Sequence, residues 1–370
     1  MNNNKKSKVL FVLPNDKLGG AEQHLKNIAS HLISNNFVAD VYFLKKETSF
    51  QWRGMGENIN LFFTKKNKES LGVISFLIML LQRNSKNRKY DYIFTSHVHV
   101  NSLVGILIFL GILKKKFFIG RESTSIFRRF KGIKLLMFKA FYKLGYFKLD
   151  LLICQTNYMK AQLEEALPKL ASLINIEVIP NPINLNSINI EDDDFDLFNQ
   201  NYIVSAGRLI PEKGYDVLIK AFATLTNKFS DLKLVILGEG EQRARLGKLI
   251  KDLHLNDKVI LLGFKKNVYS YFNSAKVCVV SSRIEGFPNV LLQMMSQNTT
   301  VVCTLCAGGI SEIPLIYTCE PDNVGELASV IQLSLMEDNI DKRPMFDNYL
   351  HKRSVTAFIN KVNHYLGVTT

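Results

Sequence analysis

The chain has 370 residues with 47% hydrophobic and 22% charged side chains, and its formal net charge is +14. This composition excludes an intrinsically disordered or fibrous chain, and the length favours two globular domains over one. The excess positive charge lies in the first half, because residues 1–180 hold 28 basic and 12 acidic side chains and residues 181–370 hold 19 and 21.

A first half with a charge of +16 (28 − 12) predicts an anionic partner, either a nucleic acid or a membrane surface. The sequence has no zinc-ligand spacing, no ribonucleoprotein motif and no helix-turn-helix pattern. We therefore expect an anionic membrane surface as a partner and no nucleic acid, with solubility alone as the other explanation of the charge.

The start of the chain and its cysteines predict a cytoplasmic protein. Residues 1–8 lead into a short apolar run ending at Pro14, without the apolar core or cleavage site of a signal peptide. Two longer apolar runs, 71–81 and 103–113, have eleven residues each, fewer than the ~20 needed to span a bilayer. Five cysteines, an odd number, favour reduced thiols. We expect a peripheral protein at the inner face of the plasma membrane.

The first half alternates short apolar segments rich in β-formers with amphipathic helical patterns. Strands are predicted at 9–13, 38–44, 59–63, 92–95, 117–120 and 151–154, and helices at 21–34, 71–83, 103–110 and 126–144. This alternation is typical of a parallel sheet covered on both faces.

The alternation stops near residues 176–183, where Pro180 and Pro182 stiffen the chain and exclude helix. The acidic run 191–196 is interpreted as a solvated connection rather than a metal-binding pair. We predict one domain over 1–180 and a second domain over 181–345. Residues 346–370 are expected to form a C-terminal helix that packs back on the first domain.

The second half repeats the α/β pattern. Strands are predicted at 202–206, 232–237, 259–262, 277–280 and 300–303, and helices at 216–229, 242–253, 290–296 and 324–335. The fold class is α/β, with two Rossmann-like domains that are expected to face each other across a cleft. Open α/β sheets bind ligands beyond the carboxyl ends of their strands.

The most informative motif is Ser281-Ser282-Arg283-Ile284-Glu285-Gly286-Phe287-Pro288-Asn289, between a predicted strand and a predicted helix. The N–H groups at a helix start favour an anionic ligand. Glu285 beside them is suited instead to accept hydrogen bonds from hydroxyl groups. A phosphate site next to a hydroxyl acceptor suggests a sugar nucleotide.

A second motif, residues 207–214, also follows a predicted strand and carries two glycines and two cations. Arg208 can chelate two phosphate oxygens, and Lys213 adds a point charge. Gly19 and Gly20 occupy the corresponding turn after the first strand, but they lack the spacing of a dinucleotide fingerprint.

Other segments give weaker signals. The turns at Gly238 and at Gly263-Phe264 could border the diphosphate or the nucleobase. His97 and His99 follow a strand at alternate positions, so both would point the same way, and Arg121-Glu122 ends the next strand. Cys303 and Cys306 form a single CxxC without a second pair, so we expect core packing and no metal site.

Together these segments resemble the retaining glycosyltransferases of family 4, which have the GT-B fold. The resemblance covers nearly the whole chain and rests on Gly19-Gly20, on Gly207-Arg208 with Lys213-Gly214, and on Glu285-Gly286-Phe287. It is greatest to the branch that builds bacterial capsule, O-antigen and other surface polysaccharides. It implies transfer of a hexosyl group from a nucleotide diphosphate sugar, UDP being the expected nucleotide, to a lipid-linked or growing glycan.

The resemblance also implies roles for the site residues. Arg208 and Lys213 would neutralise the leaving diphosphate, Glu285 would hold the sugar hydroxyls, and His97, or alternatively His99, would contact the sugar near the reacting carbon. The full expected donor site is Gly19, Gly20, Arg208, Lys213, Gly238, Gly263, Phe264, Glu285, Gly286, Phe287, Asn289, Val290, Leu291 and Gln293, with His99, Arg121 and Glu122 on the acceptor side. No cofactor is implied, because the nucleotide-sugar is a substrate.

The chain departs from the family at Gln293, where the family has the second acid that holds the ribose hydroxyls. Glutamine offers one acceptor oxygen in place of two, which weakens donor binding by ~1 to 2 kcal/mol. This departure keeps two alternatives open: a non-catalytic sugar-nucleotide-binding relative and a nucleotide-sugar epimerase of the same fold.

Overall fold

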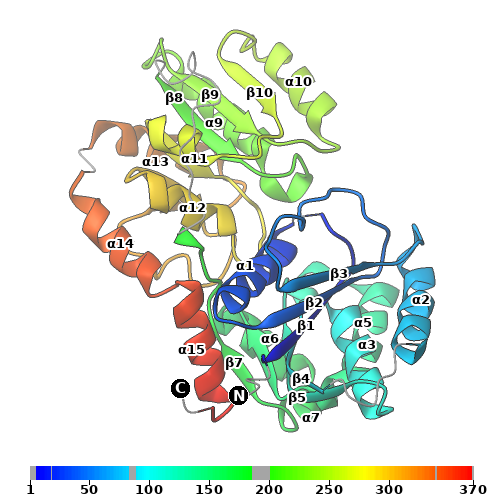
Figure 1. Cartoon of the computed structure of the whole chain (residues 1–370). Helices are drawn as coiled ribbons and strands as arrows, with labels where there is room; N and C mark the ends of the chain where they lie inside the picture. The colour runs from blue at the N-terminus through cyan, green and yellow to red at the C-terminus, as the bar shows by residue number, and fades with distance from the viewer. Residues whose placement is uncertain (1–5, 18, 83–88, 186–200, 338–339, 369–370) are drawn as a thin grey trace. The chain divides into compact units, whose positions relative to one another are not determined.

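The computed structural model describes residues 6–17, 19–82, 89–185, 201–337 and 340–368. The chain forms two compact units (Figure 1). The first unit consists of Met1–Pro182 and Val355–Thr370, and the second unit is Ile183–Ser354. The acidic run 191–196 lies outside the described residues.

The first unit contains a seven-stranded parallel sheet in the order β3-β2-β1-β4-β5-β6-β7. Its strands are β1 (Lys8–Leu13), β2 (Val38–Phe43), β3 (Ile59–Phe63), β4 (Lys89–Thr95), β5 (Lys114–Arg121), β6 (Leu151–Cys154) and β7 (Ile176–Val178). Alternate residues of β1 enter the two cores on either side of the sheet: Phe11 joins one cluster and Val12 the other. The sheet is therefore apolar on both faces, as expected for a parallel sheet.

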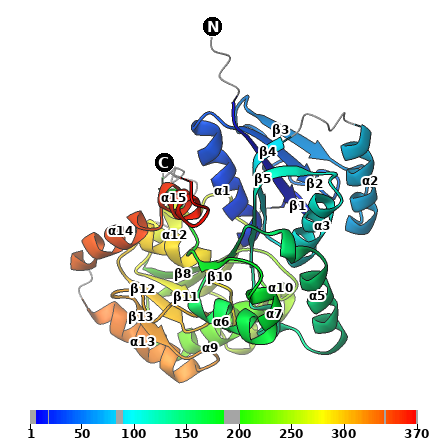
Figure 2. The same cartoon turned by 90° about the horizontal axis from the view of Figure 1, so that it is seen from below.

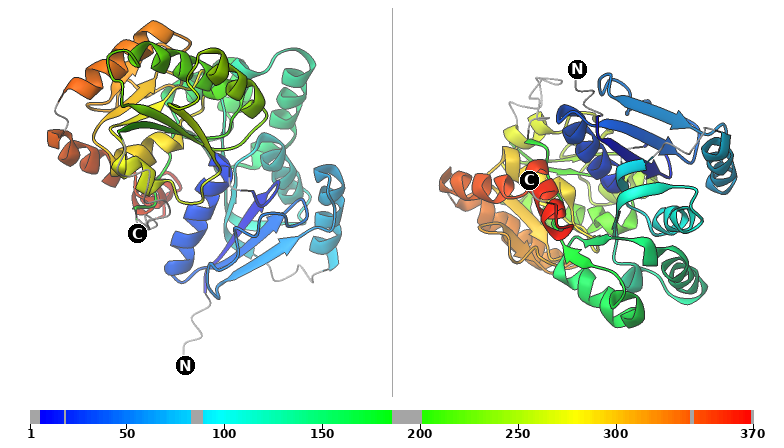
Figure 3. Two further views of the ribbon diagram at one scale, coloured as in Figure 1. Left: turned by 90° about the horizontal axis from the view of Figure 1, so that it is seen from above. Right: turned by 60° about the horizontal axis from the view of Figure 1, so that its bottom comes forward.

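Helices cover both faces of this sheet. They are α1 (Gly20–Ser34), α2 (Glu69–Gln82), α3 (Val98–Phe109), α4 (Ile126–Arg129), α5 (Gly132–Gly145), η2 (Tyr146–Lys148), α6 (Asn157–Ala166), α7 (Pro168–Ala171) and α15 (Val355–Tyr365). Helices α1 and α15 contribute to one core, and Figure 2 shows them beside each other. Helices α2, α3 and α5 contribute to the other core and form one layer in Figure 3.

The second unit contains a six-stranded parallel sheet in the order β10-β9-β8-β11-β12-β13. Its elements are β8 (Tyr202–Ala206), η4 (Pro211–Lys213), α9 (Tyr215–Leu225), β9 (Lys233–Leu237), α10 (Arg243–Asp252), β10 (Val259–Gly263), α11 (Tyr269–Ser274), β11 (Val277–Val280), α12 (Asn289–Gln297), β12 (Val301–Thr304), β13 (Tyr317–Cys319), α13 (Val324–Met336), η5 (Ile340–Lys342) and α14 (Arg343–His351). Two apolar clusters flank this sheet as well. Both units are thus Rossmann-like α/β layers, as predicted.

Two predicted helices are each divided in the structure. The helix expected at 126–144 is interrupted before α5, where Gly132 has a φ of +57°. The expected helix over 346–370 is also two helices, α14 in the second unit and α15 in the first. The unit boundary therefore lies at Ser354/Val355 and not at 345/346. Strands β7 and β13 have three residues each and were missed, because runs this short give no periodicity.

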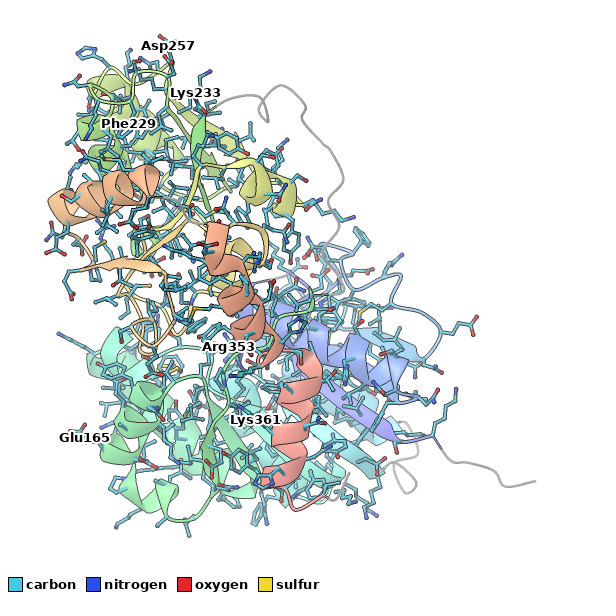
Figure 4. All side chains as sticks on the ribbon, turned by 90° about the vertical axis from the view of Figure 1, so that its left-hand side faces the viewer. Glu165, Phe229, Lys233, Asp257, Arg353 and Lys361 are labelled. Carbon is cyan, nitrogen blue, oxygen red and sulfur yellow. The ribbon has the colours of Figure 1, made fainter. Side chains whose placement is uncertain are left out.

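The two ends of the second unit are joined by backbone pairing. The Ile183 N–H donates to the Arg353 carbonyl at 2.8 Å, and Ile183 forms a parallel bridge with Ser354. Arg353 is labelled in Figure 4 in the turn between α14 and α15, and its guanidinium lies 4.9 Å from the centre of the Phe287 ring. Residues 183–354 thus form an insert whose first and last residues lie side by side.

Candidate active site

The second unit brings two predicted motifs together at the centre of its sheet. Strands β8 and β11 are neighbours, whereas β9 follows β8 on the other side, so the strand order reverses between β8 and β11. Residues 207–214 follow β8 and residues 281–288 follow β11. Open α/β sheets bind ligands at such a reversal, beyond the carboxyl ends of the strands. Both motifs lie there, because each follows the carboxyl end of its strand.

The loop after β8 is shaped by Gly214, which ends η4 in the left-handed conformation with a φ of +62°. A Cβ at this position would lie 2.1 Å from the Ser281 carbonyl oxygen. Only glycine therefore permits this approach of the two loops. The Ser281 hydroxyl adds a hydrogen bond to the Lys213 carbonyl at 3.0 Å.

Arg283 connects the loop after β11 to the loop after β8 and to α9 through hydrogen bonds and an ion pair. Its backbone N–H donates to the Glu212 carbonyl at 2.7 Å, and its guanidinium donates to the Pro211 carbonyl at 2.6 Å. Two further bonds of 2.9 Å reach both carboxylate oxygens of Asp216 in α9. This half-buried ion pair raises the pKa of Arg283 and lowers the pKa of Asp216. A bidentate pair of this kind fixes direction as well as distance.

These connections between the loops after β8 and β11 place Lys213 and Glu285 against each other. The Lys213 Nζ lies 2.5 Å from Glu285 Oε1, and the two side chains are 18% and 20% exposed. The Ser282 hydroxyl donates to the same Oε1 at 3.0 Å, and the Glu285 N–H donates to the Cys306 carbonyl at 2.9 Å. A cation and a carboxylate that are 72 residues apart in the sequence thus share one site that remains open to solvent.

Arg208 lies on the same loop as Lys213, one residue after Gly207, and its side chain is exposed. Among the described residues, no carboxylate lies within ion-pair distance of its guanidinium. Within the same described part of the chain, no hydrogen bond or ion pair joins the Arg208 side chain to Lys213 or Glu285. Its five N–H donors therefore remain available for an anion.

The start of α12 differs in part from the prediction. Helix α12 begins at Asn289 after Pro288, so its first turn points N–H groups out of the helix start. The Leu291 N–H already donates to the Pro288 carbonyl at 2.9 Å, so the backbone of this expected donor-site residue has a protein partner. The Phe287 ring is buried in the core beneath the loop and offers no surface to a donor. Gly286 is buried, and Val290 is half-buried.

The remaining predicted donor residues lie at neighbouring strand ends or on α12. Gly238 follows β9 and donates its N–H to the Gly263 carbonyl at the end of β10, at 2.7 Å. Phe264, the next residue, exposes most of its ring to solvent. Gln293 is half-buried on α12 and donates from Nε2 to the Tyr269 hydroxyl at 3.3 Å. The amide of Gln293 thus has a protein partner, while its carbonyl oxygen can accept from a ligand.

The first unit repeats this arrangement, because its strand order reverses between β1 and β4. Gly19 and Gly20 follow β1 and start α1, and His97 follows β4. His97 Nε2 lies 3.4 Å from Glu22 Oε1 in the first turn of α1. Glu22 was not assigned a role from the sequence, although its position directly after two glycines is the signal that could have found it.

His97 and His99 were expected at alternate positions of a strand end, but they lie at the start of a helix, where their ring centres are 5.9 Å apart. Helix α3 starts at Val98, five residues before the predicted start, so His97 precedes the helix and His99 lies in its first turn. His99 faces Glu69 of α2, with 3.3 Å between Nε2 and Oε2, and His97 faces Glu22. Burial, assisted by the charges of His99 and Arg121, lowers the pKa of His97 to about 4, so its imidazole is neutral at pH 7.

Arg121 and Glu122 are interior groups of the first unit and not a surface for an acceptor, which corrects the prediction. They are 4% and 3% exposed. Both carboxylate oxygens of Glu122 accept hydrogen bonds from tyrosine hydroxyls, from Tyr142 at 2.8 Å and from Tyr146 at 2.9 Å. Burial raises the pKa of Glu122 to about 7 and lowers the pKa of Arg121 to about 10.

The two halves of this fold match known family models. The model described as Glycosyltransferase Family 4 matches residues 18–187, and the model described as Glycosyl transferases group 1 matches residues 189–353. The chain belongs to the family 4 glycosyltransferases. The residues at the two strand-order reversals, Gly20 with His97 and Lys213 with Glu285, lie within these matched ranges.

Relatives of this family 4 glycosyltransferase include two curated proteins. An uncharacterized glycosyltransferase of Methanocaldococcus jannaschii is 29% identical over 67% of this chain and 65% of its own length. The N-acetylgalactosamine-N,N'-diacetylbacillosaminyl-diphospho-undecaprenol 4-alpha-N-acetylgalactosaminyltransferase of Campylobacter jejuni is 34% identical over 60% of each chain. The matched segments thus span less than two thirds of these relatives.

Among solved structures, HepE of Anabaena in complex with UDP and glucose has the same fold. The TM-score is 0.77 at 19% identity, over 98% of this chain and 100% of HepE.

All five cysteines of the family 4 glycosyltransferase are buried, including Cys303 and Cys306, as predicted. Within the described residues, we find no helix whose length and apolar content would let it cross a bilayer.

The titration of Glu122 gives a testable prediction. The carboxyl titrates at its ordinary 4.5 in the unfolded chain and at about 7 in the folded one, so the folded protein binds the proton more tightly. Wild-type stability is therefore greatest below pH 4.5 as far as this group is concerned, and it falls as pH rises to about 7. We expect the neutral Glu122→Gln variant to lack this fall. Its melting temperature, relative to that of the wild type at the same pH, should therefore rise from pH 5 to pH 8. A difference that stays constant over this range would contradict the assignment.

Proposed function

We propose that this protein transfers a hexosyl group from a nucleotide diphosphate sugar, with UDP as the nucleotide, to a lipid-linked or growing surface glycan. The observation that carries the proposal is the Lys213–Glu285 pair at the strand-order reversal of the second unit. The cation suits the diphosphate, and the carboxylate suits the hydroxyls of the sugar. The Campylobacter jejuni relative, named for transfer to a diphospho-undecaprenol-linked glycan, and the HepE complex with UDP and glucose support it.

In this proposal the reaction retains the configuration of the anomeric carbon. The acceptor hydroxyl attacks from the face that the diphosphate leaves, and the departing phosphate oxygen takes the acceptor proton. Negative charge then develops on the leaving diphosphate, where Arg208 and Lys213 stabilise it. Because Glu285 holds the Lys213 Nζ at 2.5 Å, the ammonium is positioned before the donor binds. Such preorganised charge requires little rearrangement during the reaction.

The first unit supplies the remaining groups of the proposed mechanism. The start of α1 at Gly20 faces the diphosphate, since a helix start favours anions. His97, neutral because burial lowers its pKa, forms a hydrogen bond with the sugar near the reacting carbon. Glu22, 3.4 Å from the Nε2 of His97, orients the imidazole. The burial of Glu122 leaves the acceptor to be held by other residues of this unit.

The proposed reaction needs no metal ion and no cofactor, because Arg208 and Lys213 provide the positive charge that a metal would bring to the diphosphate. We expect full activity after dialysis against EDTA. The measurement is the initial rate of nucleotide release with EDTA and with added Mg²⁺. Activity abolished by EDTA and restored by Mg²⁺ would contradict this part of the proposal.

Gln293 gives a prediction about donor affinity. A carboxylate at this position accepts charge-assisted hydrogen bonds from the ribose, and it gains ~1 to 2 kcal/mol over the amide. We therefore expect Gln293→Glu to tighten nucleotide-sugar binding about tenfold. Isothermal titration calorimetry with UDP and with its sugar conjugates measures the change. An equal or weaker affinity would mean that Gln293 does not face the ribose.

The acceptor in this proposal is a glycan on a polyprenyl diphosphate, which keeps the enzyme in the cytoplasm at the inner face of the plasma membrane. An anionic membrane surface is then a natural partner of the basic first half of the chain, and a nucleic acid is not. The peripheral location agrees with the charge of +16 over residues 1–180.

A thermal-shift screen against UDP-, GDP- and ADP-sugars tests the donor assignment without knowledge of the acceptor. Ligands that bind the folded state raise its melting temperature, so the screen ranks the donors by affinity. We expect a UDP-sugar to give the largest shift. No shift with any nucleotide-sugar would overturn the proposed function.

A donor-binding protein without turnover is the second candidate, and Gln293 is the observation that favours it. Such a protein would be stabilised by UDP-sugars yet release no UDP with any membrane-extracted acceptor. An epimerase would differ again, because it would convert the donor sugar with no acceptor present. The same donor incubation, analysed for nucleotide and for sugar, separates the three.

A further inference from the structure

Helix α5 of the first unit exposes a stripe of large apolar side chains. Ile133, Leu136, Met137 and Leu144 are 79%, 65%, 56% and 56% exposed. Leu136, Met137 and Leu144 lie three, four and eleven residues after Ile133, which places all four on one side of the helix. A contiguous apolar patch on an otherwise soluble surface marks an interaction site.

The opposite side of α5 is firmly packed, so the exposed stripe is a fixed surface. Tyr142 and Gly145 are buried against the core of the first unit, and Leu135 and Phe138 pack on it. A Cβ on Gly145 would lie 2.2 Å from the Ser102 carbonyl oxygen, which shows how closely α5 approaches α3. The helix cannot turn its apolar stripe inward without giving up these contacts.

Cations accompany the apolar stripe. Residues 126–148 contain seven lysines and arginines and no acidic residue. At about 100° per residue, Lys134 and Lys143 fall on opposite flanks of the stripe. Both are exposed, and the Lys134 ammonium lies 4.6 Å from the centre of the Phe130 ring. We call the four apolar residues together with these two lysines the α5 face.

The neighbouring helix α2 has a second stripe of the same kind. Leu71, Ile74, Ile78 and Leu81 are all exposed and lie three, seven and ten residues along one side of the helix. Figure 3 shows α2 in the same layer as α5, with α3 between them. The same layer of the first unit thus carries two amphipathic helices with exposed apolar stripes.

We propose that the α5 face docks on an anionic phospholipid bilayer, with the helix lying in the plane of the interface. Apolar side chains between flanking lysines are the pattern of helices that insert to the depth of the headgroup boundary. The 14 residues of α5 span about 21 Å, which is too short to cross a bilayer. The inference rests on the proposed function only in one respect, because the lipid-linked acceptor gives the protein a reason to be at a membrane. The binding itself is inferred from the residues of the α5 face.

Two other occupants fit the α5 face less well. A second copy of the chain would bring two lysine-rich faces together, which like-charge repulsion disfavours. A nucleic acid would use the lysines but would leave the aliphatic stripe in water. An anionic bilayer satisfies both kinds of side chain, since it attracts the basic residues near its surface and the apolar side chains leave water.

Liposome flotation of the full chain tests the inference. The vesicles contain phosphatidylglycerol with phosphatidylethanolamine, or phosphatidylcholine alone, at low and at high salt. One variant combines Ile133→Ser, Leu136→Ser and Met137→Ser, and another combines Lys134→Glu and Lys143→Glu. The matched controls change exposed residues of the same kinds in the second unit: Leu333→Ser with Met336→Ser on α13, and Lys248→Glu with Lys251→Glu on α10.

We expect the wild-type chain and both controls to float with the anionic vesicles at low salt. Each α5 variant should lose at least about tenfold in partition coefficient, the serine variant at all salt concentrations and the glutamate variant chiefly at low salt. Undiminished flotation of both α5 variants, or no flotation of wild type, would overturn the inference. A wild-type dimer in sedimentation velocity that the serine variant abolishes, without flotation, would assign the face to a second copy.

The test also separates this inference from the proposed function. The α5 variants change exposed side chains far in sequence from Lys213 and Glu285, so they should keep the wild-type melting shift with UDP-sugars. Flotation without a nucleotide shift would leave the docking surface valid and reject the donor assignment. A nucleotide-induced melting shift without flotation would support the donor assignment and reject the docking surface.

Discussion

We expect Lys213→Ala and Arg208→Ala each to lower kcat by about 10²–10³-fold, since removing one preorganised donor from developing negative charge has an effect of this size. Arg208 is exposed, and the Lys213 side chain is only partly buried, so both variants should remain folded. Steady-state UDP release with a saturating donor measures the loss. The melting temperature without ligand verifies the fold.

Lys251→Ala on α10 is the matched control, because it removes an exposed lysine from the same unit away from the two loops. Its kcat should equal that of the wild type. The combined variant, Arg208→Ala with Lys213→Ala, gives the sharper contradiction. If it turned over at nearly the wild-type rate, the leaving diphosphate would not be stabilised by these cations.

The second large effect is expected for Glu285→Gln. The amide can still accept the hydrogen bond from the Ser282 hydroxyl, but it neither holds the Lys213 ammonium nor accepts charge-assisted bonds from a sugar. Each such bond contributes about 1.5–3 kcal/mol, so kcat/KM should fall by at least about tenfold, and by about a hundredfold if two are lost.

The distinguishing result is the contrast between two ligands. UDP alone has no sugar, and the freed Lys213 still faces its phosphates, so calorimetry should give UDP an unchanged or higher affinity for Glu285→Gln. The affinity of the UDP-sugar should fall. Equal losses for both ligands would show that Glu285 acts only by holding Lys213 in place. Asp347→Asn, which opens the exposed Arg343–Asp347 pair on α14, is the control and should change neither affinity.

The meeting of residues 207–214 with residues 281–288 was predictable, because both segments follow strands that the sequence shows clearly. The strands before Gly207 and before Ser281 are fully buried and read as continuous apolar runs. Since parallel strands present their carboxyl ends at one edge, motifs after β8 and β11 had to meet once those strands were neighbours. The role of Arg283 could not be predicted, because its partner Asp216 is 67 residues away and an arginine in a turn is usually solvated.

The first unit was harder to predict for a different physical reason. Arg121 and Glu122 carry charges, and charged residues at a strand end usually face solvent or a ligand. Here Tyr142 and Tyr146, two residues on later elements, satisfy the Glu122 carboxylate inside the core. The start of α3 was misjudged for a related reason, because its first turn holds Val98, His99 and Val100, which are weak helix formers.

The exposed stripe of α5 was also hidden from sequence analysis. Residues 132–145 are apolar on both sides of the helix, and the pattern does not reveal which side is covered. The packing of Gly145 against Ser102 and the burial of Tyr142 show which side faces the core.

The position of α15 has a consequence for synthesis of the chain. Val355, Phe358, Ile359 and Val362 complete the core of the first unit, yet they are translated after all of residues 183–354. The nascent second unit is contiguous, and its ends pair through Ile183 and Arg353, so it has its whole sequence before the first unit does. The first unit therefore begins to leave the ribosome first but is completed last. A stop codon just before Val355 would remove α15 from the first unit and would leave the second unit with its whole sequence.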